Sequence, residues 1–487
     1  MNKLRLSFVL SFLSFILLSA SAVAKDGYKI NINFTDVEAD AKVFLCHYYG
    51  KGGTVFKDDS VTLKNGSGLI QSSKKIEGGI YLLLFADQSA NMELILQNGD
   101  NFSLTTTKKD FVSNLKLKGK SENNLFYGYQ RFLIDYGKGF NKLKDAYAKA
   151  GNKQDSVAIG EQMSKKGKEL INYRKGVIKT QPKAFLASLF RALAEPEVPE
   201  YKDWPLNDEG KKDSTFPSRY YQQHYWDGYD FQDDRLIFTP MYEPKLKNYM
   251  DRWVVPIPDT VMVACDALLK KAEGADETFK YTLWYLTRWA ETSKIMGMEE
   301  VFVYLVEEYY IGGKATWLKP EQLQKYIKRA EDIAPNMIGK PAMDIRVRNM
   351  ANQVTPLSSV SAKYTLLVFF EADCGHCKKE LPKLDSLYKS ELYKYGLKIF
   401  AVESSNEVDK WKKLVKDLNL KFGWMHVYDP DRSTNFRKFY DVYVTPTIYL
   451  LDENKTIIGR RVNHSNVLDV IKNHEKRQAE KKKQNKK

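Results

Sequence analysis

Apolar and polar residues alternate through the first part of the chain, over residues 28–117. Residues 28–34 carry an apolar side chain at every second position, which is typical of a β-strand with one buried face. Two further apolar runs, at 80–85 and 92–96, lie near Gly, Asn and Asp residues that favour turns. Short strands between such turns predict a small N-terminal antiparallel β-sandwich over residues 25–120.

The period of the apolar residues becomes helical after about residue 121. Between residues 268 and 309, apolar side chains recur mostly at three- and four-residue steps and so fall on one face of a helix. These positions are Leu268, Ala272, Phe279, Leu283, Leu286, Ala290, Val301, Leu305 and Tyr309. Several antiparallel helices, forming an all-α middle domain, are therefore predicted over residues 121–334.

Strands alternate with helices in a third section, residues 335–475. Residues 364–370 and 397–402 are nearly continuous apolar runs, as expected for strands that are buried on both faces of a sheet. Residues 447–451 and 456–458 follow as the two strands of a closing hairpin. The alternation predicts a C-terminal α/β domain in a multidomain chain. The length of 487 residues also exceeds what one hydrophobic core supports.

The N-terminus has the composition of a secretory signal peptide. Lys3 and Arg5 precede an apolar run over residues 6–18, and small residues favour cleavage after Ala24. The apolar run is shorter than the ~20 residues of a membrane-spanning helix, which disfavours an uncleaved anchor. With residues 1–24 removed, the mature protein is expected in the periplasm or the cell envelope.

Much of the net charge of +15 lies at the two ends of the chain. Residues 476–487 carry seven basic residues and one acidic residue, and the leader adds two cations, which leaves about +7 for the rest. Such a run predicts a basic, disordered tail, although it could also touch an acidic envelope surface. Nucleic acid is not expected as a partner, because export removes the protein from it.

The sequence contains four cysteines: Cys46, Cys265, Cys374 and Cys377. A scaffold stabilised by disulfides would contain many more. Cys46 lies in a strand-like pattern and Cys265 in a helical one, so both are expected to be buried hydrophobic residues. The remaining close pair is the candidate for redox chemistry.

An aromatic cluster at residues 220–231 interrupts the helical pattern. It could form a substrate-docking patch, because aromatic residues favour interfaces. A loop that packs its rings onto the helices is the preferred interpretation. His224, Asp227 and Asp230 could be drawn as a metal site, but no partner cluster accompanies them, and no metal is expected.

The sequence D-C-G-H-C-K-K-E-L-P at residues 373–382 closely follows the apolar run 364–370. Cys374 would therefore lie where a strand gives way to a helix, near unpaired backbone N–H groups and the positive end of the helix dipole. Such a setting stabilises a thiolate and lowers the pKa from the ~8.5 of a free thiol. Cys377, one turn further on, is close enough to form a disulfide with Cys374 and to release a bound partner.

Two further side chains are candidates for tuning this pair. His376, between the cysteines, can stabilise the Cys374 thiolate as a donor or a cation, which favours the dithiol form. Glu380 follows Cys377 by three residues and so neighbours it on the helix surface. Glu380 is placed to exchange a proton with the deeper thiol, or with a water beside it. These four residues are the predicted catalytic group.

The string C-G-H-C-K-K-E-L-P resembles the active-site helix of the TlpA/ResA-type branch of thioredoxins, which are bacterial periplasmic or envelope thiol oxidoreductases. That family combines a C-x-x-C pair with a basic residue, a Glu and a helix-kinking Pro. The counterparts here are Cys374, Cys377, Lys378, Glu380 and Pro382. The resemblance covers about residues 336–475 and implies a thioredoxin fold. The β-rich and helical sections resemble the front modules of multidomain members.

A second match to the family lies far downstream, at residues 444–447. The resemblance implies a cis peptide bond before Pro446, which would face the disulfide. It also implies that Thr445 offers backbone hydrogen bonds to a substrate segment. Asp373 and Gly375 are expected to complete the substrate groove.

The sequence departs from the family pattern beside the motif. Asp373 stands where thioredoxins usually carry Trp, which changes the charge of the surface that meets a substrate. Val368 occupies the place of the buried Asp of ordinary thioredoxins, so proton handling would fall to Glu380. Gly375 and His376 are similar to the central pair of disulfide isomerases, so the motif leaves the direction of electron flow open.

These features predict an exported thiol–disulfide oxidoreductase, in the first place a reductase of the TlpA/ResA type. Its partners would be protein thiols and disulfides and a membrane or envelope electron donor, without a metal or small-molecule cofactor. A structural disulfide, half of a zinc site and a peroxidase fit the motif less well. The alternative from another class is an envelope binding or scaffold protein whose front domains dock a partner, with the redox pair secondary.

Overall fold

The computed structural model describes residues 26–484, so the predicted signal peptide with its cleavage site lies outside the described residues. The chain divides into two compact units. Among the described residues, the first unit consists of 26–195, 226–230 and 234–242, and the second of 196–225, 231–233 and 243–484. In the part of the chain that the structure describes, no helix has the length and apolar character needed to cross a membrane.

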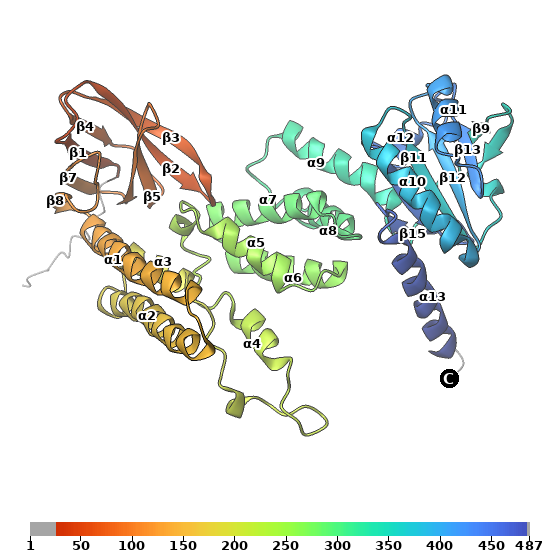
Figure 1. The fold of residues 1–487 in the computed structure, drawn as a ribbon. Helices are drawn as coiled ribbons and strands as arrows, with labels where there is room; N and C mark the ends of the chain where they lie inside the picture. The colour runs from red at the N-terminus through yellow and green to blue at the C-terminus, as the bar shows by residue number, and fades with distance from the viewer. Residues whose placement is uncertain (1–25, 485–487) are drawn as a thin grey trace, which may run out of the picture. The chain divides into compact units, whose positions relative to one another are not determined.

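The first unit contains two four-stranded sheets, with the strand orders β4-β1-β7-β8 and β3-β2-β5-β6 (Figure 1). The strands are β1 (Tyr28–Phe34), β2 (Ala41–Tyr49), β3 (Lys51–Leu63), β4 (Ser67–Ser72), β5 (Gly79–Phe85), β6 (Asn91–Leu96), β7 (Asp100–Thr106) and β8 (Lys116–Lys120). In β1 every second side chain is buried. Phe34, at its end, packs against Phe85 of the other sheet, with ring centroids 5.2 Å apart. The two sheets thus share a core, which confirms the predicted β-rich N-terminal domain.

One strand pair of these sheets differs from the antiparallel prediction. β1 and β7 run parallel, with Ile30 beside Phe102, whereas the other pairs of the two sheets are antiparallel. Parallel neighbours need a long connection rather than a hairpin, and here the strands β2 to β6 intervene in sequence. A period of two shows which face of a strand is buried but not the direction of its neighbour.

Three helices belong to the first unit: α1 (Asn123–Ala148), α2 (Lys153–Thr180) and α3 (Phe185–Ala192). The segments 226–230 and 234–242, which come later in the chain, belong to the same unit. Trp226, Tyr229 and Tyr242 in these segments are buried, and the Tyr229 ring lies 5.5 Å from that of Trp226 and 5.1 Å from that of Tyr242. Their burial favours the packing interpretation of the aromatic cluster over a docking patch.

The predicted helices of the middle section are confirmed, but they fall into both units. The helices of the second unit are α4 (Phe216–His224), α5 (Tyr242–Arg252), α6 (Pro258–Ala272), α7 (Asp276–Thr292), α8 (Met298–Leu305) and α9 (Pro320–Ile333). A π-helical turn at Val306–Ile311 continues α8. The domain boundaries at 120, 334 and 475 stay predictions.

Two of the four cysteines are buried away from any reactive setting. Cys46 in β2 and Cys265 in α6 are both 0% exposed. Burial raises the pKa of each thiol, which keeps both protonated at neutral pH. They act as small hydrophobic residues, as the sequence pattern indicated.

A seven-stranded sheet forms the centre of the C-terminal part of the second unit, with the order β10-β9-β13-β12-β11-β14-β15 (Figure 1). Its strands are β9 (Arg346–Asn349), β10 (Val354–Pro356), β11 (Tyr364–Phe370), β12 (Leu397–Glu403), β13 (Trp424–Tyr428), β14 (Thr447–Leu451) and β15 (Ile457–Arg460). β11, β12 and β13 are parallel neighbours, and β14 pairs antiparallel with β11 and with β15. This topology confirms the predicted α/β domain and its closing hairpin.

The side chains of β11 are all buried and divide between two cores. Leu366 and Val368 face the core that contains residues of α10 (Gly375–Ser390), α11 (Val408–Asp417) and α13 (Val467–Gln484). Leu367 and Phe369 face the other core, which contains Phe436 of α12 (Phe436–Phe439). Because a shift by one residue would exchange these faces, packing on both sides fixes the register of β11 and the position of the segment that follows it.

The basic tail differs from the prediction of a disordered end. Helix α13 extends into it, and Val467 and Ile471 anchor the start of this helix in the core. The residues that follow are mostly Lys, Glu, Gln, Ala and Arg, which have good helix propensity. Packing nucleates the helix, and these residues propagate it, so the prediction of disorder is wrong for residues 476–484.

Candidate active site

Cys374 lies at the N-cap of α10, between the end of β11 and the first turn of the helix. Its backbone is extended, with φ −68° and ψ 120°, and the backbone N–H of Cys377 donates a hydrogen bond to its Sγ at 3.4 Å. The sulfur therefore takes the place of a capping oxygen, at the positive end of the helix dipole. Cys377 is buried in the first turn, and both cysteines are free thiols.

The loop that precedes β14 contacts the Cys374 sulfur. The Thr445–Pro446 peptide bond is cis, as the family resemblance implied. The thiol of Cys374 donates to the carbonyl oxygen of Thr445, 3.1 Å away. The preceding residues Tyr443 and Val444 are 66% and 72% exposed. An open, apolar surface therefore adjoins the more accessible sulfur.

The two thiols have opposite pKa shifts. Partial burial raises the pKa of Cys374, but hydrogen bonds from the side chain of Thr445 and from the backbone N–H groups of Cys377 and His376 outweigh it, so this pKa lies below that of an ordinary thiol. Burial raises the pKa of Cys377 to about 12. Near neutral pH, Cys374 is therefore the better nucleophile, and Cys377 stays protonated.

Glu380 binds a residue that the sequence did not point to. Its carboxylate accepts a hydrogen bond from the backbone N–H of His464 at 2.6 Å and contacts Nδ1 of the same residue at 2.8 Å. His464 lies 84 positions further along the chain, in the segment between β15 and α13, so no local motif could reveal the pair. Proton exchange between Glu380 and Cys377 stays a prediction.

The other predicted site residues lie on the exposed side of the cysteine pair. Asp373 forms an ion pair with Lys410 at 2.7 Å, and this hydrogen bond lowers the pKa of Asp373. Gly375 and His376 are exposed in the first turn of α10. A methyl group at Gly375 would meet open space. His376 acts on Cys374 through its backbone N–H, while stabilisation by its ring stays a prediction.

A pocket of about 380 Å³ lies at the carboxyl ends of β11, β12 and β13. Glu371, which follows β11, binds Arg437 at 2.6 Å, and Arg437 also donates to the carbonyl oxygen of Ser404 at 2.9 Å. These bonds tie together the segments that follow β11 and β12. They hold the short connection that leads into Cys374.

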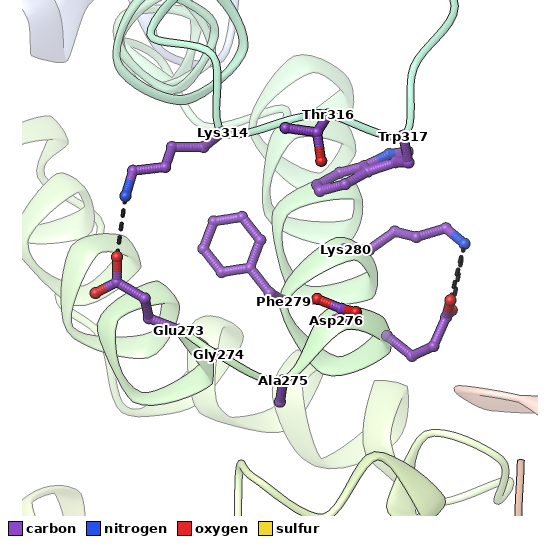
Figure 2. A pocket seen from close by; sticks show the side chains of 10 residues that line it. Glu273, Gly274, Ala275, Asp276, Phe279, Lys280, Lys314, Thr316 and Trp317 are labelled. Atoms are coloured by element: carbon purple, nitrogen blue, oxygen red, sulfur yellow. Dashed lines mark hydrogen bonds and ion pairs between the residues drawn. The ribbon is translucent and has the colours of Figure 1, made fainter.

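A second pocket, of about 400 Å³, lies on the helical part of the second unit. Figure 2 shows Phe279 between two ion pairs, with Lys314 bound to Glu273 at 2.9 Å on one side and Lys280 bound to Glu277 at 3.2 Å on the other. Because these charges neutralise each other, we assign no catalytic role to this pocket.

No group of three or more His, Cys, Asp or Glu side chains is placed to hold a metal ion within residues 26–484. His224, which was considered as a metal ligand, packs its ring on Tyr220 with centroids 4.1 Å apart.

Three family models match successive parts of the chain. Residues 338–460 match the AhpC/TSA family. Residues 28–126 match a domain of unknown function, DUF4369, and residues 173–336 match another, DUF5106. The redox motif thus lies within the part that matches a named family.

Curated relatives are similar to the C-terminal part of the chain. The thiol-disulfide oxidoreductase ResA of a Bacillus cereus strain is 28% identical over 123 residues, which are 25% of this chain and 68% of the relative. ResA of Bacillus thuringiensis subsp. konkukian is 29% identical over 121 residues, which are 25% of this chain and 67% of the relative.

Solved structures resemble larger or smaller parts of the chain. A thioredoxin-like protein from Bacteroides caccae is 18% identical, with a TM-score of 0.46 and coverage of 58% of this chain and 98% of its own. A domain of a possible thiol-disulfide isomerase from Cytophaga hutchinsonii is 34% identical, with a TM-score of 0.29 and coverage of 30% of this chain and 98% of its own.

The α/β sheet and the matched family define the C-terminal part of the chain as a thioredoxin-like thiol–disulfide oxidoreductase domain. Its sequence is similar to the thiol-disulfide oxidoreductase ResA of Bacillus species.

Proposed function

We propose that the Cys374/Cys377 pair reduces disulfides in exported proteins of the cell envelope. The observation that carries this proposal is the asymmetry of the pair. Cys374 is partly exposed at a helix N-terminus with a lowered pKa, and Cys377 is buried with its pKa raised to about 12. One sulfur is thus prepared to attack, and the other is held back until the first has reacted.

The proposed reaction has two exchange steps. The Cys374 thiolate attacks one sulfur of a substrate disulfide, whose S–S bond breaks, and the leaving sulfur takes up a proton. Cys377 then loses its proton and attacks Sγ of Cys374, which breaks the mixed disulfide and releases the second substrate thiol. The substrate gains two electrons, and the Cys374–Cys377 disulfide forms. A dithiol of a membrane or envelope electron donor must then reduce the pair again.

The substrate segment is proposed to lie along the loop that ends in Thr445 and Pro446. Exposed Tyr443 and Val444 offer apolar contacts before this point. Asp373 and Gly375 flank Cys374 and would form the opposite wall of the groove. Glu380 is proposed to supply or accept the proton that Cys377 exchanges during the second step, directly or through a water.

The envelope location rests on the predicted leader, residues 1–24, and on its cleavage after Ala24. The leader combines the cations Lys3 and Arg5 with the apolar run over residues 6–18, as secretory signals do. Partners in this setting are other exported proteins with disulfides and a donor that brings electrons from the inner membrane.

The reduction potential of the pair tests the proposal. Mature protein is equilibrated in glutathione or dithiothreitol buffers, with Cys374→Ser as the control. A value near ~−270 mV supports a reductase, whereas one near ~−120 to −180 mV supports an oxidase or isomerase. If the pair shows no reversible titration, the redox proposal fails, and an envelope scaffold whose front domains bind a partner takes its place.

Trapping separates the roles of the two sulfurs. Cys377→Ser should accumulate a mixed disulfide with a model disulfide protein, because the second step is blocked. Cys374→Ser should accumulate none. Equal trapping by both variants would contradict the assignment of Cys374 as the attacking sulfur.

A further inference from the structure

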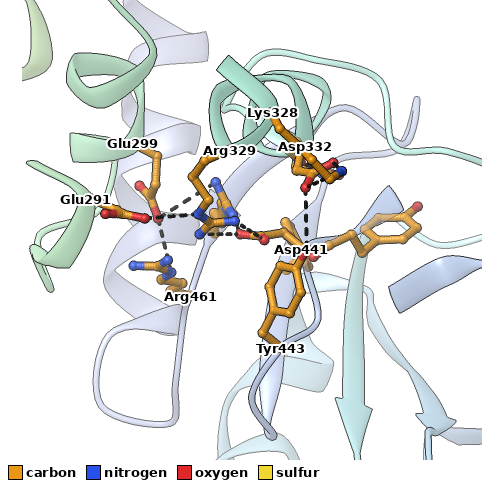
Figure 3. Close-up of polar contacts among 12 residues, drawn as sticks. Glu291, Glu299, Lys328, Arg329, Asp332, Asp441, Tyr443 and Arg461 are labelled. Atoms are coloured by element: carbon orange, nitrogen blue, oxygen red, sulfur yellow. Dashed lines mark hydrogen bonds and ion pairs between the residues drawn. The ribbon is translucent and has the colours of Figure 1, made fainter. Parts of the chain in front are cut away.

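A cluster of charged residues joins the helices of the second unit to its thioredoxin-like domain (Figure 3). Arg329 on α9 contacts both carboxylate oxygens of Asp441, with Nη1 at 2.5 Å and Nη2 at 3.3 Å. Its Nε donates to Glu291 of α7 at 3.0 Å. The side chain of Asp441 is only 2% exposed, so Arg329 reaches into the domain rather than across its surface.

A second group of contacts reinforces the same connection. Arg460 of β15 donates to Asp441 at 2.5 Å and lies 3.9 Å from Glu299 of α8. Arg461 binds Glu299 at 3.2 Å. Asp441 is therefore held from two sides. Buried ion pairs of this kind are sensitive to the loss of a single partner, because the remaining charge is left uncompensated.

The loop that starts at Asp441 leads directly to the redox pair. Asp441 has a left-handed backbone conformation, with φ 52°. Two residues on, the Arg329 guanidinium lies 5.5 Å from the ring centre of Tyr443, whose hydroxyl is 3.4 Å from the carboxylate of Asp332 on α9. The loop then reaches Thr445, whose carbonyl oxygen is 3.1 Å from Sγ of Cys374.

We propose that Arg329 is a positioning residue for the redox pair. By binding Asp441 and contacting one face of the Tyr443 ring, it fixes the loop that presents Thr445 to Cys374. The helices of the second unit thereby set the reactivity of the attacking sulfur. The inference rests on the proposed function of the Cys374/Cys377 pair. It gives a role in that function to Arg329, which lies in residues 173–336, the part that matches a domain of unknown function.

The contacts of Thr445 give the expected direction of the effect. The carbonyl oxygen of Thr445 accepts a hydrogen bond from the Cys374 thiol, which favours the protonated form. Hydrogen bonding by the Thr445 side chain acts in the opposite direction, and the pKa of Cys374 lies below the ordinary value. If the loop is released, this stabilisation of the thiolate weakens. The pKa of Cys374 should then rise, and the dithiol form should become less stable relative to the disulfide. The pair should therefore become a stronger reductant.

The experiment compares Arg329→Gln and Arg329→Lys with wild type in the full mature chain. Lys325→Gln is the matched control, because it removes a cation from the exposed side of the same helix. The pKa of Cys374 is measured from the pH dependence of alkylation, and the reduction potential from glutathione equilibria. Circular dichroism and urea unfolding show whether each variant is folded.

Arg329→Gln should raise the pKa of Cys374 by about one unit, comparable to the loss of one hydrogen bond to the thiolate. The potential should move to a more negative value, while Lys325→Gln behaves as wild type. Arg329→Lys keeps the charge but not the two-pronged geometry, so a smaller shift in the same direction is expected. If Arg329→Gln does not fold, the pKa of Cys374 and the reduction potential measured in Arg329→Lys test the inference instead.

Folded Arg329 variants with a wild-type pKa and potential would overturn the inference, even if they were less stable, because a purely structural ion pair changes stability alone. This outcome leaves the proposed function intact, since the wild-type pair still titrates. A wild-type pair that does not titrate overturns the proposed function, and the inference with it.

Discussion

The imidazole of His464 lies 2.8 Å from the carboxylate of Glu380. Glu380 is on α10, within a turn of Cys377, and His464 precedes α13, so the contact ties the helix of the redox pair to the C-terminal helix. The backbone N–H of His464 binds the same carboxylate at 2.6 Å. A carboxylate that is proposed to move protons is thereby held in one orientation.

Replacing His464 by Ala should cost about 1 kcal/mol of unfolding free energy, because one hydrogen bond to a half-buried carboxylate is lost while the backbone bond remains. Urea unfolding of the oxidised protein measures the change. Lys472→Ala, at an exposed position on α13, is the control and should be close to neutral. If both variants match wild type, the side-chain contact with Glu380 contributes nothing to stability.

Reduced protein should lose stability in alkaline solution because of Cys377. A thiol whose pKa is raised by folding, here to about 12, holds its proton more tightly in the folded state. The contribution of this thiol to the free energy of unfolding is complete below the ordinary pKa of ~8.5. It is lost as the pH rises towards the pKa of the folded state. At about pH 9.5 the loss should be roughly 1.4 kcal/mol.

The comparison for this pH effect is Cys377→Ala. Both proteins are unfolded in urea at neutral pH and at about pH 9.5. Other titrating groups are common to both proteins, so the difference between their slopes isolates Cys377. Identical slopes would show that the thiol is not held protonated by the fold.

Thr445→Ala should raise the pKa of Cys374, because the hydrogen bond from the Thr445 side chain favours the thiolate. The expected size is about one unit, and alkylation at neutral pH should slow accordingly. Thr445→Ser keeps the hydroxyl and should retain most of the wild-type rate. A wild-type pKa in the Ala variant would assign the lowering to the helix N-terminus alone.

Gly423→Ala should destabilise the second unit by about 2 kcal/mol or more, because two effects add. Gly423 has φ 75°, and an added methyl group would lie 1.9 Å from the hydroxyl of Tyr388. Thermal unfolding measures the loss. Gly375→Ala is the matched control, since its methyl group meets open space and its backbone is helical. Equal melting temperatures for the two variants would contradict this account.

Features that depend on neighbouring residues could be predicted from the sequence. The alternation in residues 28–34 gave the buried face of β1, and the apolar run at 364–370 gave the central strand with both faces covered. The position of Cys374 at the start of a helix followed from the same local reasoning. In each case the residues that determine the structure lie within one strand or one helical turn.

Features that depend on distant residues were missed. The partners in Glu380–His464 are 84 positions apart, and those in Arg329–Asp441 are 112 apart. Neither residue of such a pair carries a local sign of its partner. The parallel pairing of β1 with β7 was missed for the same reason. The helix α13 was missed because charge was taken as evidence against order, although its residues favour helices once packing has nucleated one.

The burial of Cys46 and Cys265 fixes the electron stoichiometry of the folded protein. Because Cys377 is also buried and protonated, a thiol reagent should count one group, Cys374, per reduced native chain and four after unfolding. No spare sulfur then competes for the mixed disulfide or scrambles it during turnover. Each catalytic cycle therefore transfers one electron pair, and the chain cannot store a second.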